Sequence, residues 1–262
     1  MPASEAVAPL AAAPLTVSVV SHGHDAWLPQ LLGQIAATGA GRVAHVILTH
    51  NQAPAPQTLV ALARAWPFEL TEIRNVTPAG FGANHNRAFE QSCTPYFCVL
   101  NPDICLSDTD IWAELLRCAA QPRVGCAYPE LLNPDGTRQD NARQVPTPWA
   151  LFLRRVLRRQ DARVDWASAA FWVLPAEAYR RLGGFDERYF MYCEDADFCL
   201  RLQLAGWGLT RARAQAVHHA QRSSHRQWQH LAWHVRSLLR LWSSQVLRHY
   251  RLRTRAAAEG AG

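Results

Sequence analysis

The chain of 262 residues is 49% hydrophobic and 18% charged, a composition that excludes a disordered or collagen-like polymer and predicts one sizeable core. Its formal net charge is +6, and all 27 basic residues are arginines. No window holds the roughly 18 to 20 uninterrupted apolar residues of a membrane-spanning helix, so none is expected.

Residues 1–14 are rich in alanine and proline and carry no basic residue. They are predicted to be a flexible N-terminus and not a signal peptide, because a signal peptide begins with a positively charged region. The seven cysteines include no CxxC pair, which predicts reduced thiols. Both features favour a cytoplasmic protein.

Short β-rich runs alternate with helical patterns through the first half of the chain. The predicted strands are Leu15 to Ser21, Val43 to Thr49, Phe68 to Arg74 and Tyr96 to Leu100, and the predicted helices are Trp27 to Ala37, Thr58 to Trp66 and Asp108 to Ala120. Such alternation is typical of βαβ units, which build a mostly parallel central sheet flanked by helices. The predicted fold class is α/β.

Two polar segments interrupt this pattern. In NVTPAGFGANHNRAFEQS, Gly80 and Gly82 form a predicted turn that opens a helix near Ala83, where backbone amides can face an anion; a plain turn is the alternative. Asn101 and Asp103 follow the fourth strand, at the edge where open α/β sheets bind ligands.

The second half is less regular. Residues 129–165 are predicted to be an irregular acceptor or lid loop, followed by a strand from Trp166 to Leu174. The segment RYFMYCEDADFCLRLQLAGWG then places Glu194, Asp195 and Asp197 in the first turn of a helix, where the helix dipole stabilises carboxylates. A cluster that only caps the helix is the alternative.

The ordered motifs VSVVS, NVTPAGFGANHNRAF, LNPD, AAFWVLP, LGGFDERYFMYCEDADFCLRL and VHH resemble family 2 inverting glycosyltransferases, especially their rhamnosyltransferase-like branch. The resemblance implies a GT-A domain over residues 15–224, with a nucleotide-sugar-binding half (15–128) and an acceptor-binding, catalytic half (129–224). It implies transfer of a sugar such as rhamnose from a dTDP- or UDP-sugar to a glycan or polyprenyl-linked glycan in bacterial surface polysaccharide synthesis.

The same resemblance assigns catalytic roles. Asp195 is the expected general base and Glu194 its supporting residue, while Asp197 and Trp172 are expected to bind the acceptor. Asp103 is the expected ligand of Mg²⁺ or Mn²⁺, because hard cations prefer carboxylate oxygens. A histidine of Val217-His218-His219 is expected to join it; His218 is favoured and His219 is the alternative.

Donor binding departs from the family pattern. The family usually carries an Asp-Asn pair after the second strand, where this chain has His50 and Asn51. A neutral imidazole can still hydrogen-bond a base or a ribose hydroxyl. The further candidates for donor binding are Ser21, His22, Gly82, Asn84 and Asn101. Asn101 likewise stands in place of the first aspartate of the family's Asp-x-Asp motif. The His50 and Asn101 departures keep open a catalytically silent GT-A module that only binds a nucleotide sugar or a partner enzyme.

The C-terminal part, residues 225–262, is predicted to be a basic amphipathic helix and tail. Between Asp197 and Glu259 the chain has eleven arginines and no acidic residue. An apolar stripe recurs at helical spacing through Trp228, Leu231, Val235, Leu238, Trp242 and Val246. The stripe and the charge predict a peripheral contact with anionic lipid on the cytoplasmic face of the inner membrane. Docking of the stripe on protein is the alternative, and no motif indicates specific nucleic-acid binding.

Overall fold

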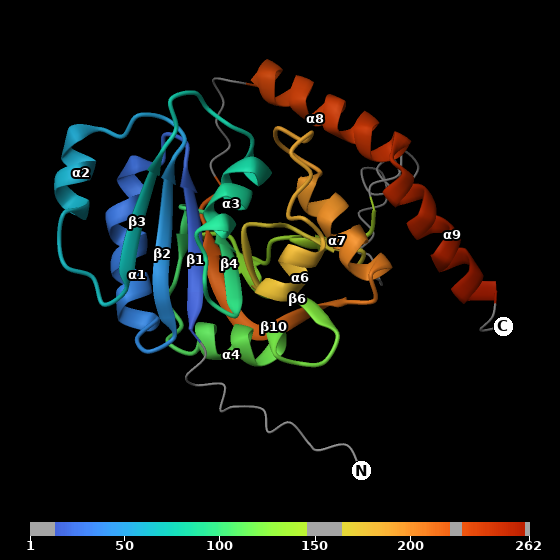
Figure 1. The fold of residues 1–262 in the computed structure, drawn as a ribbon, viewed down its shortest axis with the longest axis horizontal. Helices are drawn as coiled ribbons and strands as arrows, with labels where there is room; N and C mark the ends of the chain where they lie inside the picture. Colours follow the sequence, from blue (N-terminus) through green and yellow to red (C-terminus); the bar gives the residue numbers. More distant parts are fainter. Residues whose placement is uncertain (1–13, 146–163, 221–226, 260–262) are drawn as a thin grey trace, which may run out of the picture.

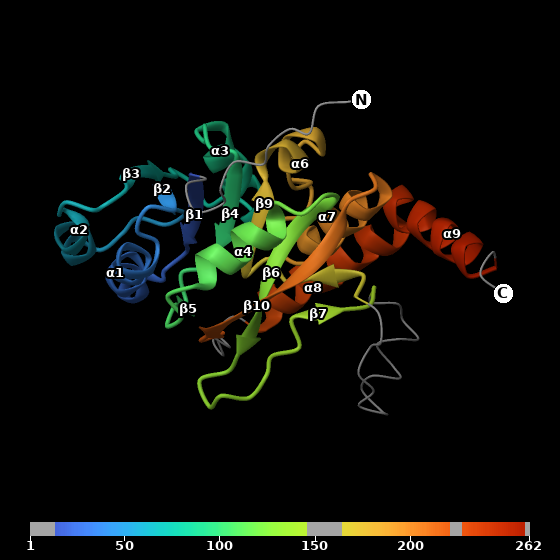
Figure 2. The same cartoon turned by 90° about the horizontal axis from the view of Figure 1, so that it is seen from below.

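The computed structural model describes residues 14–145, 164–220 and 227–259. These residues form an eight-stranded sheet in the order β3-β2-β1-β4-β9-β6-β10-β5, with helices packed on both faces (Figures 1 and 2). The N-terminal residues predicted to be flexible lie outside the described residues, except Pro14.

The first strands are parallel, as the alternating pattern predicts. They are β1 (Leu15–Ser21), β2 (Val43–His50), β3 (Glu69–Arg74) and β4 (Tyr96–Leu100). Strand β1 lies between β2 and β4, and every one of its residues is buried. The carboxyl ends of these parallel strands therefore lie at one edge of the sheet. Ser21 and His50 end β1 and β2 there, and Asn101 follows β4.

The second half adds antiparallel pairs. Strand β9 (Phe171–Pro175) runs antiparallel to β4 and β6 (Val124–Leu132), and β10 (Gly208–His218) runs parallel to β6. The short strand β5 (Ile104–Cys105) pairs antiparallel with the end of β10. This last pairing brings the chain after β4 back to the carboxyl end of β10.

Helices cover both faces of the sheet. They are α1 (Leu28–Thr38), α2 (Pro56–Leu62), α3 (Phe81–Glu90), α4 (Ile111–Ala119), α6 (Ala176–Arg181) and α7 (Glu194–Leu204). Leucines and isoleucines of α1 and α4 pack with β1 and β2 into one core, and α3, α6 and α7 pack on the other face around Trp172 and Phe198. All seven cysteines are free, as expected.

The region predicted to be irregular contains more structure than its prolines suggest. Strand β6 continues to Leu132, and β7 (Ala142–Arg143) pairs with β8 (Trp166–Ala167). Residues 146–163, which make up about half of the predicted loop, lie outside the described residues. The single strand predicted from Trp166 is wrong, because residues 168–170 leave the ladder between β8 and β9.

The predicted C-terminal helix is divided in two. Helix α8 (Gln227–Ser243) ends before Ser244, and α9 (Gln245–Glu259) begins after it. The Ser244 hydroxyl accepts a hydrogen bond from the Leu247 N–H at 3.1 Å, which is the geometry of a helix N-cap. Within the described residues, no helix combines the length and apolar character that crossing a membrane requires.

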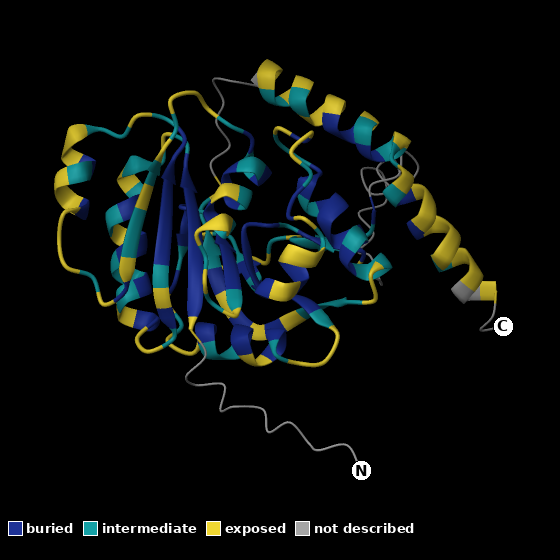
Figure 3. Ribbon diagram, in the orientation of Figure 1, coloured by how far each residue is buried: buried dark blue, intermediate teal, exposed yellow. Residues whose placement is uncertain are grey.

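The predicted apolar stripe has an exposed part and a buried part, and the change from one to the other falls within α8, which Figure 3 colours by burial. Leu238 is buried in a core cluster with Leu200 and Tyr250, and Trp242 and Val246 pack against that cluster. Trp228, Leu231 and Val235 are instead exposed, with 84% of Trp228 accessible. One part of the stripe therefore docks on the protein, and the other part has a free surface.

Candidate active site

Asp103 and His218 meet where β5 pairs with β10. The Asp103 side chain is 8% exposed, and its Oδ1 lies 3.4 Å from Nε2 of His218. Gln139 donates through its amide to the His218 carbonyl at 2.8 Å, so its Oε1 is the atom 2.9 Å from His218 Nδ1. Oε1 can only accept, hence Nδ1 carries the proton and the Nε2 of a neutral His218 is bare.

Two acceptor atoms therefore face each other at the sheet edge. Oδ1 of Asp103 is buried and has no hydrogen-bond partner among the described residues. A carboxylate oxygen and a bare imidazole nitrogen repel unless a proton or a cation lies between them. Such a pair, with the second imidazole nitrogen held by an outer partner, is typical of metal ligands. Sequence reasoning missed Gln139, which no motif marks.

The neighbouring His219 points elsewhere. Its ring lies 4.7 Å from that of Trp27, and only its backbone N–H reaches Asp103, donating to the carbonyl at 2.9 Å. Of the two candidates in the VHH motif, His218 therefore has the side chain that approaches the carboxylate.

Helix α7 begins with the other two acidic candidates. Glu194 is 5% exposed, and its Oε2 has no hydrogen-bond partner in the described part of the chain. Asp195 is partly exposed and accepts hydrogen bonds from the backbone N–H groups of Ala196 and Ala169. Burial raises the pKa of Asp195 to about 6, and burial followed by the charge of Asp195 raises the pKa of Glu194 well above its usual value. Asp195 is thus the accessible carboxylate that is ionised at neutral pH.

The residues between β8 and β9 join the two acidic regions. The Asn101 N–H donates to the Ala170 carbonyl at 2.8 Å, while the N–H of Ala169 donates to Asp195. Two consecutive residues therefore touch the segment leading to Asp103 on one side and the start of α7 on the other. The structure therefore places the start of α7, with Asp195, near the segment that carries Asn101 and Asp103.

A network of amides supports the predicted donor region. Asn51 accepts hydrogen bonds from Asn75 and from the Ala79 backbone, both at 2.8 Å, and Asn75 also donates to Asn84 at 2.7 Å. Asn51 and Asn84 are buried. Asn51 and Asn84 hold residues 75–80 in place, so their role in this structure is to fix the conformation of this loop. Asn75, at the centre, was not singled out in the sequence.

The first strand end lies beside this network. His22 Nδ1 is 3.0 Å from the Asn51 amide, and the Ser21 hydroxyl is 3.4 Å from Asp25, whose other oxygen accepts the Ala55 N–H at 2.7 Å. The predicted donor-site residues of β1 and β2 are therefore assembled in one place. Whether they contact a donor stays a prediction.

The His50 side chain is buried and does not face solvent. It is 1% exposed, and its Nε2 lies 2.9 Å from Oε2 of Glu72 on β3. Its Nδ1 is buried without a hydrogen-bond partner in the described residues. Because the carboxylate accepts the Nε2 proton, a neutral His50 keeps a lone pair at Nδ1. Glu72 was missed because strand β3 otherwise follows an ordinary alternating pattern.

The two glycines of the predicted turn have a packing role. A Cβ at Gly82 would lie 2.5 Å from Cβ of Phe185, and a Cβ at Gly80 would lie 2.9 Å from the Phe190 carbonyl oxygen. Any other residue at either position would push the segment 185–190 away. The glycines therefore permit close contact between α3 and the loop before α7.

Both predicted acceptor-binding residues lie in the interior. Oδ2 of Asp197 accepts from Nε of Arg201 at 2.7 Å, and Arg201 also donates to the carbonyls of Leu182 and Gly184. Trp172 is fully buried and packs near Phe198. Neither side chain is open to an acceptor; both instead fix α7 against the sheet.

Comparison with known proteins agrees with this arrangement. The model of the glycosyltransferase-like family 2 matches residues 12–240, which include every candidate described above. The chain belongs to this family. The sequence-based recognition of family 2 is confirmed.

Its relatives include rhamnosyltransferases. The N-acetylglucosaminyl-diphospho-decaprenol L-rhamnosyltransferase of Mycobacterium tuberculosis is 33% identical over 183 residues, which cover 62% of this chain and 60% of that relative. The rhamnosyltransferase WbbL of Escherichia coli is 26% identical over 249 residues, 86% of this chain and 90% of WbbL.

A solved mannosyltransferase shows the same fold. The mannosyltransferase PcManGT from Pyrobaculum calidifontis, in complex with GDP-Man and Mn²⁺, superposes with a TM-score of 0.60 at 18% identity, over 95% of this chain and 75% of that one. At this identity the likeness concerns the fold alone. It confirms the predicted GT-A fold.

Proposed function

We propose that this chain is a divalent-cation-dependent inverting glycosyltransferase that moves a sugar such as rhamnose from a dTDP- or UDP-sugar to a glycan or polyprenyl-linked glycan acceptor. The observation that carries the proposal is the pair of facing acceptor atoms, Asp103 Oδ1 and His218 Nε2, linked through residues 169–170 to the ionisable Asp195. The names of the relatives support the sugar and the lipid-linked acceptor.

Asp195 performs the proton transfer. It accepts the proton of the acceptor hydroxyl while that oxygen forms a bond to the anomeric carbon of the donor sugar. The bond from the anomeric carbon to the diphosphate oxygen breaks on the opposite side, and the nucleoside diphosphate leaves with the electron pair. A single displacement of this kind inverts the anomeric configuration. Glu194 is buried beside Asp195, and burial and the charge of Asp195 raise its pKa well above the usual value, so it is proposed to support the base and not to replace it.

Asp103 and His218 fit a divalent cation, Mg²⁺ or Mn²⁺. Within the described residues, no group of three or more His, Cys, Asp or Glu side chains is arranged to hold a metal. A cation held by Asp103 and His218 alone would have its remaining coordination positions filled by water and phosphate. A site for a metal bound to phosphates needs such positions. When bound, the cation neutralises charge on the departing diphosphate. Gln139 orients His218 for this task.

His50 is proposed to contact the base or ribose of the donor in place of the usual aspartate. Its lone pair at Nδ1 accepts a hydrogen bond, as one carboxylate oxygen would, while Glu72 holds the opposite nitrogen. The other proposed donor-binding residues are Ser21, His22, Asn51, Gly82, Asn84 and Asn101. The acceptor-binding roles of Asp197 and Trp172 would be indirect, through the position of α7.

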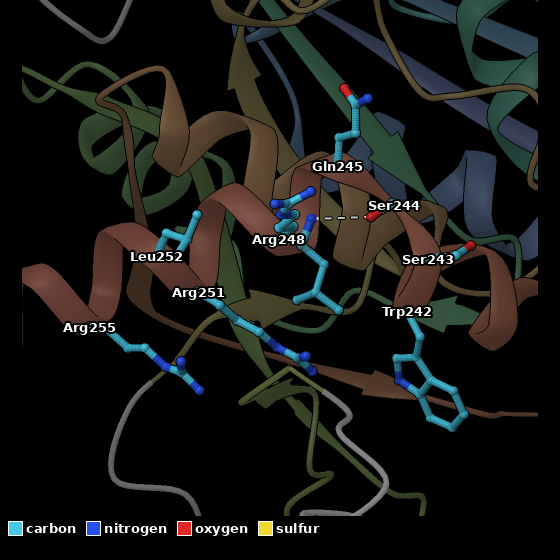
Figure 4. A pocket seen from close by; sticks show the side chains of 9 residues that line it. Trp242, Ser243, Ser244, Gln245, Arg248, Arg251, Leu252 and Arg255 are labelled. Atoms are coloured by element: carbon cyan, nitrogen blue, oxygen red, sulfur yellow. Dashed lines mark hydrogen bonds between the residues drawn. The ribbon is translucent and has the colours of Figure 1, made fainter.

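The outer side of α8 is proposed to contact an anionic membrane surface, on the cytoplasmic face of the inner membrane. Its groove is lined by Trp228, Leu231, Ala232, Val235, Arg236 and Leu239. A second pocket lies where α8 meets α9, and there Arg251 and Arg255 extend from α9 on the side of Trp242 (Figure 4). Apolar side chains flanked by arginines suit the boundary between acyl chains and anionic headgroups. This placement would bring the active site to a lipid-linked acceptor.

The direct test is transfer by the purified full chain. It is incubated with dTDP-rhamnose, Mg²⁺ and an N-acetylglucosaminyl-diphospho-polyprenol, and the mass of the lipid product is measured by mass spectrometry. We expect one added deoxyhexose with the wild type and none with Asp195→Asn. Tight binding of nucleotide sugars with no product from any donor–acceptor pair would instead identify a silent binding module.

A further inference from the structure

The short segment Tyr189–Cys193 leads directly into the catalytic helix α7. Tyr192 and Cys193 have φ values of 71° and 66°, in the left-handed region. This region is unfavourable for residues with a Cβ, and two such residues in succession persist only when their surroundings hold them. Since Glu194 and Asp195 follow immediately, whatever holds this segment also sets the direction of the acidic pair.

Helix α8 supplies those surroundings on one side. The Tyr192 hydroxyl lies 2.8 Å from Nδ1 of His230, and the Ser237 hydroxyl donates to the Met191 carbonyl at 2.8 Å. The ring centroids of Phe190 and Trp233 are 4.9 Å apart. Three consecutive residues of the segment are thus contacted by three successive turns of α8.

The donor region contacts the same segment from the other side. The Phe81 N–H, at the start of α3, donates to the Phe190 carbonyl at 2.9 Å. The close approach of Gly80 to Phe190 allows this contact. The segment is therefore held between the start of α3 and helix α8, immediately before the proposed base.

We propose that α8 is a positioning element for catalysis, and that the hydrogen bond between Tyr192 and His230 is the contact that orients Glu194 and Asp195. The proposal rests on the function assigned above to Asp195. His230 touches neither donor nor acceptor in this scheme; it acts through the backbone of Tyr192 and Cys193. Its loss should reduce turnover and leave donor binding intact, because the donor region keeps its own amide network.

The test compares three variants of the full chain. His230→Leu removes the polar partner of Tyr192, and His230→Asn retains a polar atom close to the place of Nδ1. His249→Leu is the matched control, because His249 is exposed on the neighbouring helix α9. Hydrogen–deuterium exchange is followed in peptides covering residues 189–197, and kcat and donor KM are measured in the transfer assay.

We expect His230→Leu to exchange faster in residues 189–197 and to lose kcat by roughly tenfold to a hundredfold, the size of a small misplacement of a catalytic group. Its donor KM should stay within about twofold of the wild type, since uniform binding is untouched. His230→Asn should recover most of the kcat, and His249→Leu should match the wild type in both measurements.

Two results would overturn the proposal. The first is that the folded His230→Leu protein exchanges hydrogen in residues 189–197 at the same rate as the wild type. The second is that His230→Asn loses as much kcat as His230→Leu. An inactive wild type would count against the proposed function alone, because the exchange measurement needs no substrate and still decides whether His230 holds the segment.

Discussion

Oδ1 of Asp103 and Nε2 of His218 face each other at 3.4 Å, and the hydrogen bond from Nδ1 to Gln139 leaves neither atom a proton to share when the imidazole is neutral. Asp103 follows β4 and His218 ends β10, so the sheet topology, through the short strand β5, creates this pair. An arrangement of two bare acceptors is costly without a ligand, which makes it the most informative feature of the site.

Removal of either member should weaken metal binding. The wild type is expected to show a Mn²⁺-dependent rise in melting temperature with a nucleoside diphosphate, because a ligand bound to the native state raises its stability. Asp103→Ala and His218→Ala are expected to abolish this rise. Gln139→Leu should weaken Mn²⁺ binding about tenfold to a hundredfold, the usual effect of losing the partner of a ligating imidazole. His219→Ala is the control, and an equal loss in that variant would contradict the assignment. Full activity in excess chelator would refute the metal itself.

Asp195→Asn should remove most of the transfer while the protein stays folded and binds nucleotide. A general base typically contributes on the order of a hundredfold or more to the rate, so the loss should appear in kcat. Glu194→Gln should have a smaller effect, because the buried Glu194 is not the accessible carboxylate. Steady-state kinetics of both variants decide the matter; the reverse order of effects would make Glu194 the base.

The pH dependence of transfer should show an acidic limb. Asp195 acts as a base only when ionised, and burial raises its pKa to about 6. Activity should therefore be constant above this value and fall about tenfold per pH unit below it, as expected when one group must lose a proton. The profile of kcat/KM at constant ionic strength measures this limb. A limb centred near pH 4 would mean that the base is an unperturbed carboxylate.

Nucleotide preference should depend on His50 and its partner. His50→Ala is expected to weaken binding of the preferred nucleoside diphosphate, and Glu72→Gln should do so to a smaller extent, on the order of tenfold for a lost charged hydrogen bond. The dissociation constants of UDP, dTDP and GDP, measured by calorimetry, are the readout. Glu69→Gln, an exposed change on the same strand, serves as control. Unchanged constants in His50→Ala would exclude this residue from the donor site.

The exposed face of α8 should govern attachment to vesicles. The double variant Trp228→Ser, Leu231→Ser is expected to stop flotation with anionic liposomes at low salt, because it removes the apolar side chains that would enter the interface. Val60→Ser removes an equally exposed apolar residue, 77% accessible, from α2 and should float normally. If the wild type does not float, or if the double variant floats as well as the wild type, α8 does not bind the membrane.

The alternation of apolar runs and the ordered motifs were sufficient to predict, from the sequence alone, the family, the GT-A fold and the location of the acidic segment. Strand β1 matches its predicted bounds: LTVSVVS is rich in β-branched residues, which favour a strand, and all of its residues are buried. The acidic cluster at Glu194 likewise stands at the start of a helix, as its dipole preference predicts.

Only the tertiary structure showed which atoms meet. The tautomer of His218, the partner of His50 and the link through Ala169 depend on contacts between residues far apart in the chain, and such contacts leave no periodic trace. Local choices were also overruled: the Ser244 cap divides a helix whose apolar spacing continues unbroken, and Trp172 is buried although its motif indicates an acceptor site. Hydrophobic periodicity specifies which face of an element is buried, whereas the packing of one element on another decides which polar atoms on that face find a partner and which are left to bind a ligand.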